Sequence, residues 1–404
     1  MKRILLTIAA VLLVTVVTAF ALGPGYLERS FNQVIPHEPY AISDSARGLH
    51  ADLVIADLHA DTLLWRRDPL TRAARGHVDV PRLVDGNVAV QVFAAVTKVP
   101  QGLNYEENTA DSDQITGAAI LQRWPVATWT SLFERARHQA HRLDAAAAAE
   151  PQALRVIRTR EDLEAVLTAR AGGSDLIGAL LATEGLHPLE GKLGNIARLQ
   201  ALGYRMMGLH HFFDNALGGS LHGESQAGLS EFGREVVAEL ERRGILIDVA
   251  HSSAAVVEDV LELTDSPIVV SHTGVKGACD SPRNLPDALM QRIAASGGVI
   301  GIGYWDGAVC DPSPQSVVAA LRYAIDLLGV DHVGLGSDYD GATTVAFDTS
   351  ELAVLTERML DDGFSETEIR KVMGGNVIRL LQERLPSERE PNAARHKGDP
   401  TSGR

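Results

Sequence analysis

The sequence has few cysteines and little positive charge. Its 404 residues include only Cys279 and Cys310, and 37 Lys and Arg stand against 52 Asp and Glu, which gives a net charge of −15 at pH 7. Two cysteines exclude a disulfide framework and a four-cysteine zinc module, and their small number favours two separate thiols over a disulfide. A protein that binds the phosphate backbone needs a basic surface, so the composition argues against a nucleic-acid partner.

Long apolar runs are absent except at the N-terminus. Met1-Lys2-Arg3 precede an apolar run from Ile4 to Leu22, a pattern typical of export signals. As a helix, with about 1.5 Å per residue, the run nearly spans a bilayer core of about 30 Å. We therefore favour an uncleaved anchor over residues 1–22, with the rest of the chain facing the periplasm or exterior. Ala19-Phe20-Ala21 has the pattern of a cleavage site, so a cleaved signal peptide and a secreted or periplasmic protein form the alternative.

The rest of the chain divides into a linker, one domain and a tail. Residues 23–50 contain proline, glycine and scattered polar residues, which is typical of a linker. Residues 386–404 are polar and predicted to be disordered. The domain is expected over residues 51–385, and the 45% hydrophobic composition is sufficient for a sizeable core.

Short apolar runs alternate with helical stretches across this domain. Such runs are typical of parallel strands buried on both faces, and the alternation predicts a parallel sheet. The expected strands are residues 53–56, 88–95, 176–182, 205–209, 245–249, 268–270, 299–302 and 332–335. Eight strands predict a closed (β/α)₈ TIM-type barrel in an α/β fold, with an open doubly wound sheet as the competing arrangement. The long connection at residues 100–149 predicts a helical insertion over the barrel mouth.

Ionisable side chains follow six of the eight expected strands. They are His59 and Asp61 after the first strand, Glu184 after the third, His210 and His211 after the fourth, His251 after the fifth, His272 after the sixth and Asp338 after the eighth. In a closed barrel these ends meet at one mouth, where catalytic groups lie. Buried ionisable groups are costly unless they are paired or bind a metal, so the set predicts a metal centre.

The five strongest ligand candidates are three histidines and two carboxylates, without a thiolate. They are His59, Asp61, Glu184, His251 and His272. This set exceeds the three protein ligands of one catalytic zinc and fits two ions that share Glu184. Two ions about 3.5–4 Å apart hold a water between them, lower its pKa and polarise a carbonyl. Asp338 can take the proton of that water and return it to a leaving amine, which predicts amide hydrolysis. Manganese and cobalt fit the same donor set.

Seven segments match a known family in both order and spacing. They are Asp57–Thr62, Ala182–Gly185, Leu209–Asn215, Asp248–Ser253, Val270–Thr273, Pro282–Asp287 and Gly336–Gly341. On these residues the chain resembles the membrane (renal) dipeptidase family of zinc peptidases, family M19, within the amidohydrolase-type barrels. The resemblance implies zinc-dependent hydrolysis of dipeptides. It places His59 and Asp61 on one zinc ion and His251 and His272 on the other, with Glu184 bridging the two ions.

The resemblance also implies substrate-binding residues. The family's substrate-side histidine falls on His211, with His210 beside it, and would bind the tetrahedral intermediate. Arg283 falls on the arginine that holds the free carboxylate of the dipeptide, a bidentate role that suits a planar guanidinium. Asp338 falls on the acidic residue beside the water. Mammalian members use a C-terminal lipid anchor, whereas anchoring here depends on residues 4–22.

Two other functions are open. The same site would serve another amidohydrolase activity, on a lactam, an N-acyl amino acid or a dipeptide with a D-residue, according to the pocket that residues 100–149 build. A metal-bound scaffold or solute-binding protein is the non-enzymatic alternative, against which the complete ligand set and Asp338 argue. The candidate partners are a dipeptide substrate, the membrane and a second copy of this chain.

Overall fold

A closed ring of parallel strands forms the centre of the computed structural model, which describes residues 1–388. The ring contains β2 (Ile55–Ala60), β3 (Val88–Val96), β5 (Ile177–Glu184), β6 (Tyr204–Gly208), β7 (Leu246–Asp248), β8 (Val269–Thr273), β9 (Val299–Ile302) and β10 (Val333–Leu335). Pairing of β10 with β2 and of β3 with β5 closes the ring. The predicted (β/α)₈ barrel is therefore confirmed, and the open sheet is wrong. Every residue of β3 and β5 is buried, as expected for strands covered on both faces.

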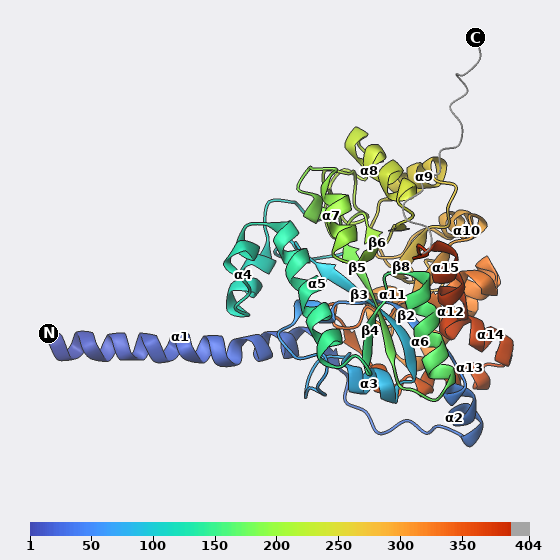
Figure 1. Ribbon diagram of the computed structural model, residues 1–404, viewed down its shortest axis with the longest axis horizontal. Helices are drawn as coiled ribbons and strands as arrows, with labels where there is room; N and C mark the ends of the chain where they lie inside the picture. The colour runs from blue at the N-terminus through green and yellow to red at the C-terminus, as the bar shows by residue number, and fades with distance from the viewer. Residues whose placement is uncertain (389–404) are drawn as a thin grey trace, which may run out of the picture.

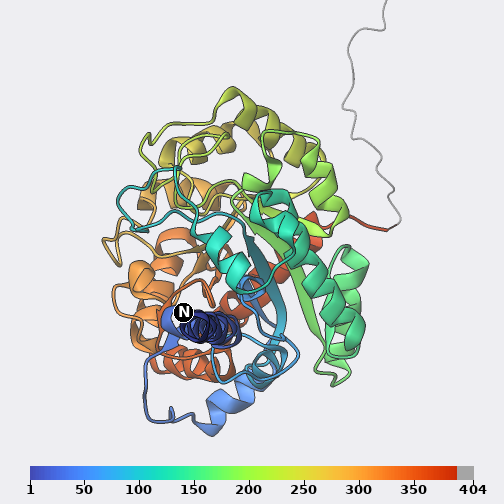
Figure 2. The same cartoon turned by 90° about the vertical axis from the view of Figure 1, so that its left-hand side faces the viewer.

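Helices surround the ring, as Figures 1 and 2 show. They include α3 (Val80–Asp85), α6 (Arg160–Ala171), α7 (Asn195–Ala201), α8 (Glu231–Arg242), α9 (Ala254–Leu263), α10 (Asp287–Ala295), α11 (Asp306–Val309), α12 (Pro314–Leu328), α13 (Ala353–Asp361) and α14 (Glu366–Arg370). Serine caps begin several of them. Ser253 accepts a hydrogen bond from the backbone N–H of Val256 at the start of α9, and Ser313 does the same at the start of α12.

The last helix, α15 (Asn376–Arg384), crosses the amino ends of the strands. Asn376 Nδ2 donates to the carbonyl oxygens of Val330 and Val333 at 2.7 and 2.8 Å, where β10 begins. Arg384 Nη1 donates to Ser266 Oγ at 2.5 Å, just before β8. Because this helix covers one end of the barrel, the carboxyl ends of the strands form the other end.

The connection after β3 contains the predicted helical insertion, which consists of α4 (Gln114–Leu121), η2 (Val126–Trp129) and α5 (Leu132–Ala149). It is followed by a short strand that the sequence does not reveal, β4 (Leu154–Val156), which pairs with β5 outside the ring. Three residues with an exposed arginine in the middle do not form a recognisable apolar run.

The N-terminal helix α1 (Lys2–Phe31) extends away from the barrel in Figure 1. It is long and apolar enough to cross a membrane, and its most apolar stretch is fully exposed. The segment predicted as a linker, residues 23–50, holds the end of α1, then β1 (Gln33–Val34), which pairs with β11 (Thr344–Val345), and then α2 (Asp44–Ala51). The predicted polar tail lies outside the described residues from position 389 onward.

Cys279 and Cys310 form a disulfide, with their Cα atoms 5.6 Å apart. The expectation of two separate thiols is therefore wrong. Cys279 follows β8 and Cys310 follows β9, and these strands are neighbours in the ring. The barrel thus brings together two loops that a count of cysteines cannot place. Disulfides persist in oxidising compartments, which agrees with export of this domain.

Candidate metal centre

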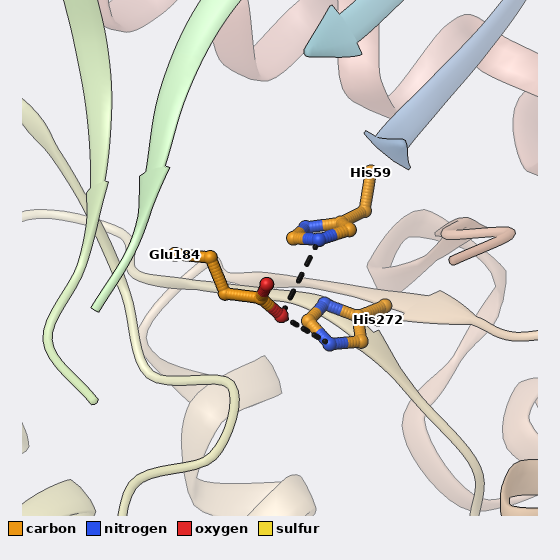
Figure 3. A group of neighbouring side chains, drawn as sticks. All are labelled: His59, Glu184 and His272. Atoms are coloured by element: carbon orange, nitrogen blue, oxygen red, sulfur yellow. Dashed lines mark ion pairs between the residues drawn. The ribbon is translucent and has the colours of Figure 1, made fainter. Parts of the chain in front are cut away.

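The carboxyl ends of the strands place Glu184 among three imidazoles. Glu184 Oε1 lies 3.5 Å from His59 Nε2, 3.2 Å from His251 Nε2 and 3.5 Å from His272 Nε2. Figure 3 shows the Glu184 carboxylate pointing toward both His59 and His272. His59 lies in β2, Glu184 in β5 and His272 in β8, and His251 lies in the loop after β7. Closure of the ring therefore gathers positions that span more than 200 residues of sequence.

The remaining carboxylates lie on the His59 side of this cluster. Asp61 Oδ1 is 3.4 Å from His59 Nε2. One ligand atom each from His59, Asp61 and Asp338 lie within 4.8 Å of one another, and the same holds for His59, Glu184 and His272. The structure therefore brings all five predicted ligands and Asp338 into one buried site.

Three of the candidate ligand atoms have no hydrogen-bond partner among the described residues. They are His59 Nε2, Asp61 Oδ1 and Glu184 Oε2, and all are buried. An unpaired buried polar atom costs about 1–3 kcal/mol, so such groups usually have a ligand. Imidazoles and carboxylates without a thiolate form the donor set that zinc and similar divalent ions prefer. The residues present thus fit a metal centre.

Burial and charge compete at the acidic side of the site. Burial alone lowers the pKa of His59, but Asp61, Glu184 and Asp338 outweigh it and raise that pKa to about 10. Burial raises the pKa of Glu184, and the charge of Asp61 adds to this effect. Burial likewise raises the pKa of Asp338 to about 8, although His59 opposes it. Three carboxylates held together in low dielectric attract a cation.

The other side of the site is neutral. Burial lowers the pKa of His251 and His272 well below the usual value, and the charge of Arg283 adds to both shifts. The two Nε2 atoms lie 2.9 Å apart. Since an imidazole binds a metal in its neutral form, these two side chains need no deprotonation at neutral pH.

Side chains behind the cluster orient its members. Ser271 Oγ lies 3.2 Å from His59 Nδ1 and 2.8 Å from His272 Nδ1. Asp57 Oδ1 accepts from the backbone N–H of His59 at 2.9 Å, and Asp248 Oδ1 accepts from that of Ser271 at 2.9 Å. Ser271, Asp57 and Asp248 lie inside the sequence motifs but were not predicted as site residues. They act on the orientation of the ligands, which residue type alone does not reveal.

The geometry distinguishes His211 from its neighbour His210. His211 Nε2 is 3.3 Å from Glu184 Oε2, and its Nδ1 is 3.3 Å from the carbonyl oxygen of Lys98. His210 instead contacts Ser252 Oγ through Nδ1 at 3.1 Å. Of these two imidazoles, His211 is the one that lies beside the Glu184 carboxylate.

Arg283 lies at the wall of the site with 1% of its surface exposed. Its Nη2 donates to the carbonyl oxygen of His272 at 2.8 Å. The sequence analysis did not identify Tyr105, which lies in the loop between β3 and α4. The Tyr105 hydroxyl accepts a hydrogen bond from Trp305 Nε1 at 2.8 Å, and burial, with the nearby charge of Asp338, raises its pKa to about 12. A single tyrosine in a long loop gives no signal of this position.

Known proteins resemble this chain along most of its length. The model of the membrane dipeptidase family, peptidase family M19, matches residues 43–393. Dipeptidase verJ of Clonostachys rogersoniana is 28% identical over 312 residues, which are 76% of this chain and 75% of the relative. The crystal structure of the dipeptidase AC, a metallopeptidase of family M19, has 26% identity and a TM-score of 0.68, covering 83% of this chain and 99% of that one. A metallopeptidase from Rhodobacter sphaeroides, liganded with a phosphinate mimic of the dipeptide L-Ala-D-Ala, has 26% identity and a TM-score of 0.69, covering 82% and 99%.

Proposed function

The chain belongs to the membrane dipeptidase family, the M19 metallopeptidases, and from this premise we propose that it hydrolyses dipeptides with two zinc ions. His59 and Asp61 would hold one ion, His251 and His272 the other, and Glu184 both. The observation that carries the proposal is the position of Glu184 Oε1, within 3.5 Å of three imidazole Nε2 atoms. Bound zinc supplies a Lewis acid that polarises the peptide carbonyl and lowers the pKa of water.

Asp338 would move the proton of the reaction. Its carboxylate lies near His59 and Asp61 and is buried. Burial raises the pKa of this carboxyl to about 8 in the metal-free site. A carboxylate at this position can accept a proton and release it again. It would accept the proton of the attacking water and deliver it to the leaving amine.

Arg283 and His211 would bind the substrate. The guanidinium of Arg283 would hold the free carboxylate of the dipeptide, which favours dipeptides because a longer peptide leaves that buried charge unpaired. His211 would face the oxygen of the tetrahedral centre. When Nδ1 of His211 donates to the Lys98 carbonyl, Nε2 needs a second proton before it can donate. Negative charge that develops beside the ring favours that imidazolium form.

The N-terminal helix would anchor the enzyme, with the barrel facing the periplasm or exterior. The apolar surface of α1 and the disulfide of Cys279 and Cys310 support this location. Cleavage after Ala21, which would remove the apolar part of α1, would instead release a periplasmic or secreted enzyme. Intact-mass measurement of the purified protein distinguishes the two forms, and light scattering tests whether a second copy binds.

Elemental analysis and a substrate panel test the proposed activity. We expect two zinc ions per chain and cleavage of L-Ala-L-Ala, with little cleavage of L-Ala-L-Ala-L-Ala. Equal rates on both peptides would contradict the role of Arg283. A second candidate substrate class, dipeptides with a C-terminal D-residue, is favoured by the similarity to the Rhodobacter sphaeroides peptidase that binds an L-Ala-D-Ala mimic. L-Ala-D-Ala, an N-acyl amino acid and a lactam complete the panel.

A further inference from the structure

The loop that carries Asp338 has an unfavourable backbone conformation. Asp338, Asp340 and Ala342 have φ angles of 57°, 63° and 62°, in the left-handed region that residues other than glycine rarely adopt. Such a conformation persists only where surrounding contacts hold it. The loop follows β10 directly, so the contacts that fix it also fix the carboxylate of Asp338.

The first set of contacts converges on Asp340, whose side chain is completely buried. Its Oδ2 accepts from Thr62 Oγ1 at 2.7 Å and pairs with Arg67, while its Oδ1 accepts from the backbone N–H of His77 at 2.7 Å. Trp65 Nε1 donates to the Asp340 carbonyl oxygen at 2.6 Å. All four partners lie in the segment after β2, so this segment holds the middle of the loop.

The end of α1 supplies a second set of contacts, through Glu28. This side chain is 1% exposed, although it belongs to the same helix as the apolar run. Its Oε1 accepts from Arg67 Nε at 2.6 Å and its Oε2 accepts from Arg75 Nε at 2.5 Å. Because Arg67 pairs with both Glu28 and Asp340, a continuous buried chain of charges joins α1 to the loop that carries Asp338.

The residues after α1 bind the same loop directly. Asn32 Oδ1 accepts from the backbone N–H of Ala342 at 2.9 Å. The carbonyl oxygen of Gln33 lies 3.3 Å from His77 Nε2, and the other ring nitrogen of His77 accepts from the backbone N–H of Asp340 at 3.0 Å. The short pairing of β1 with β11 continues this attachment. In Figure 1, α1 runs without a break from its free end to this part of the barrel.

We propose that Glu28 and Asn32 are positioning residues for the Asp338 loop, so that the membrane-proximal end of α1 forms part of the catalytic apparatus. The proposal rests on the role of Asp338 given above. It predicts that loss of either contact leaves the zinc ligands in place and disturbs the proton-transfer group. It also predicts that cleavage after Ala21 leaves activity intact, because residues 22–35 stay with the domain.

The test uses the full-length chain in detergent and two variants, Glu28→Gln and Asn32→Leu. Each should lower kcat by about tenfold or more while KM changes by less than about twofold, because a small displacement of a catalytic group is costly. Zinc content should not change, and amide hydrogen exchange should accelerate over residues 336–345. Arg29→Gln, on the exposed side of the same turn, should match the wild type. Asn32→Asp keeps an acceptor for the Ala342 N–H and should retain most of the turnover.

The outcomes separate this proposal from the proposed function. If Asp338→Asn abolishes turnover but Glu28→Gln and Asn32→Leu keep wild-type kcat and exchange, the positioning role is wrong and the dipeptidase function stands. If the wild type with bound zinc cleaves no dipeptide, the function fails, and hydrogen exchange alone decides whether Glu28 and Asn32 hold the loop. If Glu28→Gln fails to fold, the positioning role is tested by Asn32→Leu and Asn32→Asp alone. Equal kcat values for these two variants would contradict it.

Discussion

The two ends of the barrel differ in what their buried residues do. At the end that α15 crosses, apolar side chains from the strands pack with those of the helix. Leu58, Leu180 and Val299 from three strands contact the cluster that includes Val377 and Leu381 of α15. At the mouth, carboxylates and imidazoles occupy a buried site, and several of their atoms have no hydrogen-bond partner within residues 1–388. One end stabilises the fold, whereas the other holds charges that cost stability and are useful only with a bound cation.

The largest expected effect is at the mouth, in Glu184→Gln. In the proposed mechanism Glu184 bridges two cations, and an amide is a poor substitute for a bridging carboxylate. We therefore expect kcat to fall by about 10³-fold or more, which corresponds to about 4 kcal/mol. The metal-free variant should be at least as stable as the metal-free wild type, because a buried charge beside Asp61 has been removed. Steady-state kinetics, zinc content and thermal unfolding check this. Glu224→Gln, which changes an exposed carboxylate in the loop after β6, is the control. A Glu184→Gln variant that keeps two zinc ions and full turnover would contradict the bridging role.

Asp338→Asn should have the next largest effect on turnover. The amide keeps the shape of the side chain but cannot carry the proton, so we expect kcat to fall by about 10²–10⁴-fold. Zinc content should stay at the wild-type value, which separates this variant from Glu184→Gln. Near-wild-type kcat would show that another group transfers the proton.

At the opposite end, Leu180→Ala should change stability and leave chemistry alone. Removing a completely buried leucine from the apolar cluster should lower the free energy of unfolding by about 2–5 kcal/mol. The kcat of the folded protein should equal that of the wild type. Chemical denaturation measures the free energy of unfolding, and kinetics below the unfolding transition measure kcat. Leu263→Ala, at a leucine that is 41% exposed, should change stability by less than about 1 kcal/mol.

The sequence predicts these two ends to different extents. The barrel follows from apolar runs, because a strand buried on both faces is apolar at nearly every position. The candidate ligands are recognisable because they stand at the carboxyl ends of the apolar runs. The disulfide, β4 and the position of Tyr105 cannot be recognised in the sequence, because each depends on which segments become neighbours after the ring closes.

The structure of the N-terminal segment also depends on contacts that the local sequence does not reveal. Gly23-Pro24-Gly25 is a pattern that ends helices, yet α1 continues through it to Phe31. The ion pairs of Glu28 with Arg67 and Arg75 are contacts that local propensity does not include. The prediction of a linker rests on composition, and composition does not show that these residues pack on the loop after β10.

The last effect is also at the mouth and concerns the coupling of metal binding to pH, which is the smallest of these effects when it is counted per pH unit. Neighbouring carboxylates raise the pKa of His59 to about 10, so this imidazole is protonated at neutral pH when no metal is bound, and it must lose its proton to become a ligand. Zinc affinity should therefore rise with pH between about 6 and 9, by about tenfold per pH unit for each proton released. His251 and His272 add nothing to this slope in that range, because burial already keeps them neutral.

Calorimetric titration of the metal-free protein with zinc, in buffers of different ionisation enthalpy, measures the number of protons released. His59→Gln should lower the affinity and reduce proton release by about one. An affinity independent of pH would contradict the charge distribution at this end of the barrel. It would mean that the acidic side of the site already holds its ligands in the metal-binding form, as the neutral side does.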